Sequence, residues 1–174
     1  MRTRIITLSI IIFSIALFRL LPHPPNVSPV AAIALFGGVY FADRRVAFLV
    51  PFAALMLSDL LIGLHDTMLY VYAGFALTVV VGFYIRSKLS ATRIAAAAVF
   101  SSALFFVLTN FGVWLTSGIY PATAEGLLQS YVAGIPFLQN SLLGNLVFTA
   151  LMFGGFTLLQ QRFRVLRQHT TTFG

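Results

Sequence analysis

Six apolar stretches, separated by short polar segments, restrict what this sequence can fold into. The chain has 174 residues, of which 59% are hydrophobic and only 9% are charged. About a quarter of the residues in a soluble domain are charged, so this composition indicates an integral membrane protein. We predict an all-α membrane protein in which residues 1–174 form one domain of six transmembrane helices. These helices are expected at residues 5–21, 27–42, 46–64, 68–85, 94–115 and 142–159.

The basic residues are distributed unevenly along this six-helix pattern. Of the eleven Lys and Arg, ten fall on one side of the membrane and only Arg19 falls on the other, which carries three of the four acids. Because cytoplasmic loops are enriched in Lys and Arg, we predict that both termini are inside, in a bacterial inner (plasma) membrane. The positive charge is then expected to meet anionic lipid rather than nucleic acid. The ten residues on the basic side are Arg2, Arg4, Arg44, Arg45, Arg86, Lys88, Arg93, Arg162, Arg164 and Arg167.

The first two stretches each leave an alternative open. Residues 1–21 resemble a cleavable signal peptide, but losing them would make the number of helices odd, so we expect an uncleaved first helix. The second stretch is short: from Pro29 to Ala42 it offers about 21 Å of helix against a hydrocarbon core of about 30 Å. It either spans with a water-filled cavity above it or is re-entrant, which would invert every later segment.

Small residues recur four positions apart in several stretches, as in Ala34, Gly38 and Ala42 or in Gly74, Thr78 and Gly82. Helices in lipid associate by close packing of such residues, so these patterns predict helix–helix contacts inside the bundle. A sharper hypothesis is that an exposed face carrying Ala95, Ala98 and Ser102 docks a partner helix.

The first outer loop is rich in proline, which makes it stiff. Pro22, Pro24 and Pro25 surround His23, and Asn26 follows. The loop is either a rigid connector or a lid whose His23 and Asn26 contact a ligand.

Two acids lie near the second outer loop. Asp59 is expected about one turn inside the outer boundary, where a carboxylate needs a partner. We therefore predict an ion pair between Arg19 and Asp59 or Asp66. His65 could join His23 in holding a divalent metal, although the regular spacing of a zinc site is missing.

The third outer segment, residues 116–141, is the longest. Apolar residues at helical spacing predict an amphipathic piece at residues 122–135, ended by Gly134 and Pro136. Amides and aromatic side chains near a cavity are economical recognition groups. The candidates contributed by this region and the flanking helices are Asn110, Trp114, Tyr120, Tyr131, Asn140 and Asn145.

Motifs of catalysis are missing from the sequence. It contains no Walker loop, no zinc-protease helix and no serine-nucleophile elbow. The absence of cysteine excludes thiolate chemistry and disulfides. We predict no catalytic residues, no cofactor and no resident metal.

Several motifs resemble a bacterial family of small, uncharacterised transport membrane proteins. They include Arg-Leu-Leu-Pro-His-Pro-Pro-Asn at residues 19–26, Ala-Leu-Phe-Gly-Gly at 34–38 and Thr-Asn-Phe-Gly-Val-Trp at 109–114. In that family a cysteine often stands at the position of Ser130 and an acid at that of Asn145. The family is in turn similar to the substrate-binding S components of energy-coupling-factor vitamin transporters. This likeness implies six helices, a pocket covered by the first, third and fifth loops, and an energising ATPase module as partner.

We therefore predict a membrane-embedded binding protein for uptake of a vitamin-like small molecule. His23, Asn26, Asp59, Asn110, Trp114 and Asn140 are expected to converge at the outer mouth, with Trp114 stacking on a ring. The alternatives are a non-transporting accessory or scaffold subunit, which predicts a filled apolar bundle, and divalent metal uptake through His23 and His65.

Overall fold

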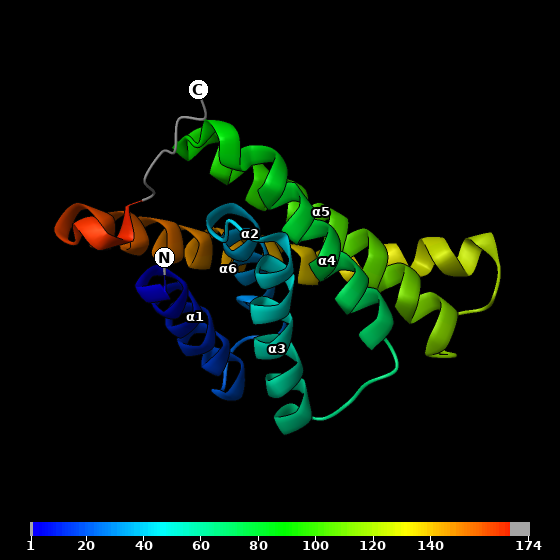
Figure 1. The fold of residues 1–174 in the computed structure, drawn as a ribbon. Helices are drawn as coiled ribbons and strands as arrows, with labels where there is room; N and C mark the ends of the chain where they lie inside the picture. The colour runs from blue at the N-terminus through cyan, green and yellow to red at the C-terminus, as the bar shows by residue number, and fades with distance from the viewer. Residues whose placement is uncertain (1, 168–174) are drawn as a thin grey trace.

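The computed structural model describes residues 2–167, and all regular secondary structure in that range is helical. Figure 1 shows the helices as a splayed bundle in which α4 and α5 run side by side. The all-helical prediction is confirmed. The elements are α1 (Arg2–Ala16), η1 (Leu17–Leu20), α2 (Val30–Tyr40), α3 (Arg44–Ile62), α4 (Met68–Ile85), η2 (Arg86–Lys88), α5 (Ala91–Thr116), α6 (Ala124–Arg162) and η3 (Arg164–Leu166).

Within residues 2–167, five helices are long and apolar enough to cross a membrane: α1 extended through η1, α3, α4 extended through η2, α5 and α6. The helix α2 is different, because its 11 residues rise only about 16 Å. That length is roughly half of a hydrocarbon core, so α2 cannot cross a bilayer by itself. The prediction of a helix over residues 27–42 is corrected to a loop followed by a short helix at Val30–Tyr40.

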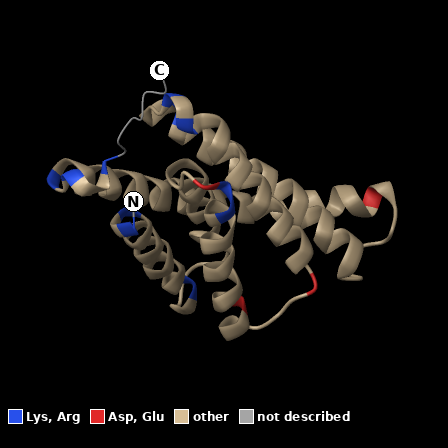
Figure 2. Ribbon diagram, viewed as in Figure 1, with Lys and Arg blue, Asp and Glu red and all other residues tan. Residues whose placement is uncertain are grey.

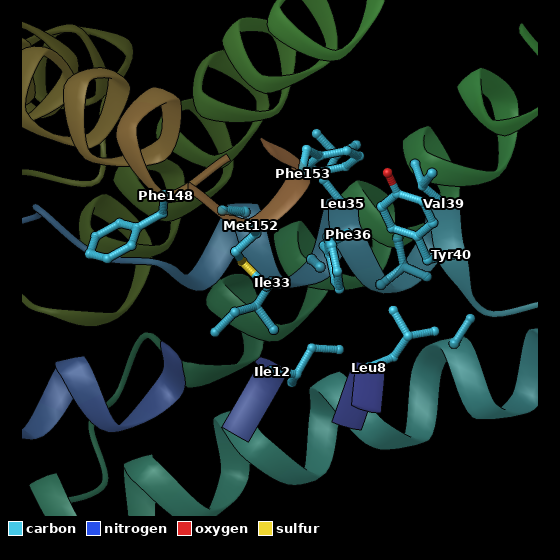
Figure 3. Close-up of a cluster of buried hydrophobic side chains, with 14 of the residues drawn as sticks. Leu8, Ile12, Ile33, Leu35, Phe36, Val39, Tyr40, Phe148, Met152 and Phe153 are labelled. Carbon is cyan, nitrogen blue, oxygen red and sulfur yellow. The ribbon is translucent and has the colours of Figure 1, made fainter. Parts of the chain in front are cut away.

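The short helix α2 lies at the centre of the bundle. Every residue from Val30 to Tyr40 is buried, as expected for a helix that is apolar on all sides. Figure 3 shows side chains of α2 meeting those of α1 and α6. The rings of Phe36 and Phe153 pack edge to face with their centroids 5.4 Å apart. The middle turns of α1 complete this core through Leu8 and Ile12.

The helices α2 and α4 approach each other through glycine. A methyl group on Gly82 would come within 2.8 Å of the Cα atom of Gly38, and one on Gly38 would collide with the carbonyl oxygen of Val79. Both glycines belong to the small-residue patterns of the sequence, which therefore do mark contacts inside the bundle.

The helix α6 is continuous from Ala124 to Arg162, although it contains Pro136. At 1.5 Å per residue its 39 residues extend for about 58 Å. The predicted amphipathic piece and the predicted last helix are thus parts of one helix, which corrects the break expected at Gly134 and Pro136. Packing explains the continuity, because Gly134 lies directly against Phe106 and Asn110 of α5.

The charged residues gather at two ends of the bundle. In Figure 2 most Lys and Arg lie toward the end of the bundle where α1 begins and α6 ends, and most Asp and Glu lie on the opposite side. We call the first the basic end; there Arg4 donates to the carbonyl oxygens of Tyr40 and Leu166, each at 3.2 Å. We call the second, with Arg19, Asp59, Asp66 and Glu125, the acidic end. Asp43 is the acid at the basic end, where it caps α3 by accepting from Arg45 N and Val46 N.

Candidate binding cavity

A cavity of about 550 Å³ opens at the acidic end of the bundle. Its walls come from the proline-rich loop, the first residues of α2 and α4, and one side each of α5 and α6. Apolar groups such as Phe105, Phe106 and Phe137 form much of the wall. The polar lining residues are Arg19, His23, Asn26, Ser28, His65, Thr67, Ser102, Thr109, Asn110, Tyr120, Ser130, Ser141 and Asn145.

Six of the ten binding residues predicted from the sequence line this cavity. They come from five different parts of the chain, which the fold brings to one place. The first loop supplies two of them and the segment after α3 supplies one. The six are His23, Asn26, His65, Asn110, Tyr120 and Asn145.

The other four do not line the cavity, because the fold uses their polar groups elsewhere. Trp114 Nε1 donates to the carbonyl oxygen of Pro121 at 2.8 Å, which fixes the turn after α5. Tyr131 donates to the carbonyl oxygen of Val107 at 3.0 Å. Asn140 Nδ2 donates to the carbonyl oxygen of Pro25 at 3.0 Å and ties the first loop to α6. The expected convergence of Trp114, Asn140 and Asp59 at the cavity is therefore corrected.

Asp59, the fourth, is buried in an ion pair beside the cavity. Its Oδ1 atom lies 2.7 Å from Arg19 Nη2, and the hydroxyl of Tyr72 donates to Oδ2 at 2.9 Å. The guanidinium of Arg19 also donates to the hydroxyl of Ser58. Asp66 is exposed and forms no ion pair within the described residues, so Arg19 pairs with Asp59 and not with Asp66.

The two histidines of the cavity belong to different loops. His23 Nδ1 lies 2.6 Å from the carbonyl oxygen of Leu21. Since a carbonyl only accepts, Nδ1 carries the hydrogen, and Nε2 is left as the acceptor in the neutral ring. His65 Nδ1 lies 3.0 Å from the hydroxyl of Thr67. Residues 2–167 contain no cluster of three or more His, Asp or Glu side chains that could hold a metal ion.

Asn145 joins α6 to α5 at the inner end of the cavity. Its Nδ2 atom donates to the carbonyl oxygen of Ala98 at 2.8 Å and to the hydroxyl of Ser102 at 2.9 Å. Both of its amide hydrogens are thereby used, and its Oδ1 atom accepts from the hydroxyl of Thr149 at 3.3 Å. Only the second lone pair of that oxygen is left for a ligand. Ala98 and Ser102 are buried by this contact, and of the residues proposed to dock a partner helix only Ala95 is exposed. The docking face is corrected accordingly.

Several lining residues were missed from the sequence. One stripe of α5 lines the cavity at helical spacing, and its periodicity was a usable signal. This stripe consists of Ser102, Phe105, Phe106, Thr109, Asn110 and Val113. On α6, Ser130 is buried and donates to the carbonyl oxygen of Asn110 at 2.9 Å, so it supports the wall more than it faces a ligand.

The fold and the five long apolar helices define a multi-pass α-helical membrane protein with a cavity at one end. The chain belongs to a family of unknown function, DUF6580, whose model matches residues 1–167. No curated protein and no solved structure matches the chain.

Proposed function

We propose that this protein is a membrane-embedded substrate-binding protein for uptake of a vitamin-like small molecule. The observation that carries the proposal is the cavity of about 550 Å³ at the acidic end. Pockets for small organic ligands have volumes of about 300–1,000 Å³ and combine apolar walls with a few polar groups. A filled apolar bundle would have favoured an accessory or scaffold subunit instead.

The groups on the wall fit an organic molecule with a ring and polar edges. Phe105, Phe106 and Phe137 offer apolar and aromatic surface. Asn110 Nδ2 donates to the carbonyl oxygen of Phe106, so its carbonyl oxygen is the group available to accept from a ligand. Tyr120 and the imidazoles of His23 and His65 add groups that donate or accept hydrogen bonds.

The charge distribution supports a cavity that opens to the outside. The basic end carries most of the Lys and Arg, and cytoplasmic loops of membrane proteins are enriched in these residues. The acidic end and its cavity would therefore face outward. In this orientation the beginning of α1 and the end of α6 would lie on the cytoplasmic side of a bacterial inner membrane. A protein of this kind binds its substrate without catalysing a reaction, and release inward would use an energising module like that of the S components. The small bundle and the loop-covered pocket are the features in favour of this likeness.

Metal uptake is the weaker alternative. His23 and His65 both line the cavity, but they are joined by no third metal-binding side chain within residues 2–167. Two neutral imidazoles alone do not complete the four-coordinate shell that a transition metal such as zinc prefers.

Native mass spectrometry of the gently solubilised wild-type protein tests the proposal. We expect one organic molecule bound per chain. A protein free of small molecules and held by a stable partner chain would overturn the proposal in favour of an accessory subunit. A bound metal ion without an organic molecule would overturn it in favour of metal uptake.

A further inference from the structure

The hydroxyls that α5 and α6 contribute to the cavity wall have most of their hydrogens bound by the protein itself. Those of Thr109 and Ser102 each donate to the carbonyl oxygen four residues earlier in α5, at 2.8 and 3.1 Å. That of Ser130 in α6 donates to the carbonyl oxygen of Asn110 at 2.9 Å. Because a hydroxyl has a single hydrogen, a ligand can use these three groups only as acceptors. Ser141 is the remaining hydroxyl of this wall, and it can donate or accept.

The two carboxamides of the same wall are restricted in a similar way. Asn145 uses both of its amide hydrogens on α5. Asn110 is half-buried, and its Nδ2 atom donates one hydrogen to the carbonyl oxygen of Phe106 at 2.9 Å. The Oδ1 atom of Asn110 lies against Gly134 of α6, where any side chain would collide with it. The glycine thus leaves room for this oxygen, which is the most accessible strong acceptor of the helical wall.

The free hydrogen-bond donors of the cavity lie mainly in the loops at its mouth. Tyr120 and Asn26 are loop residues whose hydroxyl and amide can turn to a ligand. The guanidinium of Arg19 directs its two Nη groups to Asp59 and to the hydroxyl of a serine in α3. The cavity is therefore polarised, with acceptors on its helical wall and donors at its mouth.

The cavity wall has no group that would balance a charge on the ligand. The described lining residues include no carboxylate, so a bound cation would lack a counter-ion. Arg19 is the one guanidinium among them, and it is already paired with Asp59. A bound anion would therefore meet oxygen acceptors without a free fixed cation. Because a buried charge without a partner is costly, the wall favours an uncharged ligand that donates hydrogen bonds.

An amino group on a heteroaromatic ring has the properties that this wall selects. Its lone pair is delocalised into the ring, so the group is uncharged at neutral pH and donates two hydrogens without accepting any. A ligand hydroxyl fits less well, because its own lone pairs would find few donors on the helical wall. The ring itself matches the apolar and aromatic surface of Phe105, Phe106 and Phe137.

We propose that the cavity binds an uncharged heteroaromatic molecule whose amino group donates to Asn110 Oδ1 and Thr109 Oγ1 of α5. This inference rests on the proposed function and names its substrate class. The ring lies against the phenylalanines of α5 and α6. Ring nitrogens or carbonyl oxygens of the same molecule accept from the donors at the mouth, such as Tyr120 and Asn26.

The probe for this inference is a small-molecule extract of yeast, separated by ion exchange at neutral pH into acidic, neutral and basic fractions. Protein in nanodiscs is incubated with each fraction and washed. The retained molecule is released, and its mass is measured in H2O and in D2O, because the difference counts its exchangeable hydrogens. We expect retention from the neutral fraction only, of a nitrogen-containing molecule with the absorbance of a heteroaromatic ring and at least the two exchangeable hydrogens of an amino group.

Two threonines of α5 provide a matched pair of variants that locates the amino group. Thr109→Val removes an acceptor oxygen from the cavity wall with little change of shape. Thr116→Val removes a hydroxyl that makes the same bond, to the carbonyl oxygen four residues earlier at 2.8 Å, at a position that does not line the cavity. The retained molecule is titrated into each variant. Its dissociation constant should rise about tenfold in Thr109→Val, where a donor loses its acceptor, and change less than about twofold in Thr116→Val.

Asn110→Ala is the second variant of the wall. It leaves the hydrogen bond from Ser130 in place, because that bond goes to the backbone carbonyl of residue 110. We expect binding to weaken by about tenfold or more. If Thr109→Val does not fold, Asn110→Ala decides whether the wall binds the amino group.

Each other outcome has a distinct meaning. Retention from the acidic or basic fraction would overturn this inference and leave the proposed function standing. A neutral molecule with fewer than two exchangeable hydrogens, or without a heteroaromatic ring, would do the same. Wild-type affinity in folded Thr109→Val and Asn110→Ala would overturn the assignment of the amino group to α5. No retained molecule from any fraction would overturn the proposed function and this inference together.

Discussion

Arg19 and Asp59 form a buried ion pair that ties the end of η1 to α3, with Nη2 2.7 Å from Oδ1. Tyr72 of α4 donates to the other carboxylate oxygen, so one carboxylate holds three segments together. Arg19 also lines the cavity. The pair therefore positions the proline-rich loop, with His23 and Asn26, over the cavity.

Removing the carboxylate is expected to destabilise the protein strongly. Asp59→Ala leaves a largely buried guanidinium without its counter-ion, which typically costs about 3–5 kcal/mol. The free energy of unfolding in mild detergent is the quantity to measure. Asp66→Ala is the matched control, because Asp66 is exposed and forms no ion pair within residues 2–167. Similar losses in the two variants would contradict a structural role for the pair.

A methyl group between α2 and α4 is expected to push the helices apart. The methyl of Gly82→Ala would meet the backbone of Leu35 and Gly38 at 2.8 Å. Backbone cannot yield as a flexible side chain does, so the cost should be about 1–3 kcal/mol. Thermal unfolding in detergent measures it. Gly154→Ala, which meets nothing within 4 Å, should be neutral or slightly stabilising, and the account fails if it is the more harmful change.

The orientation can be read with single thiols, because the chain has no cysteine. Asp66→Cys puts a thiol at the acidic end, and Ser87→Cys puts one at the basic end; both positions are exposed. In intact cells a membrane-impermeant maleimide should label position 66 and spare position 87 until the membrane is opened. The reverse pattern would place the cavity on the cytoplasmic side.

The sequence predicts the helices well where an apolar stretch is bounded by charge or glycine. The stretch at residues 68–85 coincides with α4, and that at 46–64 is displaced from α3 by two residues at each end. It fails at α2 and α6. The helix α2 is short and is buried on all sides by other helices. The helix α6 continues through Pro136 where it packs on α5. These contacts between helices are not visible in the local sequence.

The cavity was predictable in part. His23, Asn26 and Asn110 line it as expected. Polar residues near the helix ends at one side of a membrane avoid the lipid and therefore face the interior of the bundle or a cavity. Trp114 and Asn140 were misplaced, since backbone carbonyls of Pro121 and Pro25 accept their hydrogens, and such partners depend on the tertiary fold.

The most direct test of ligand binding in this cavity is a pair of neighbouring tryptophan substitutions. Ala133 of α6 lines the cavity, whereas Val132 does not and is 57% exposed. Ala133→Trp places an indole in the cavity and so takes up part of its volume, and Val132→Trp adds the same bulk outside it. Native mass spectrometry of both variants should show the bound small molecule lost from Ala133→Trp and retained by Val132→Trp. Retention of the molecule by a folded Ala133→Trp variant would contradict the account.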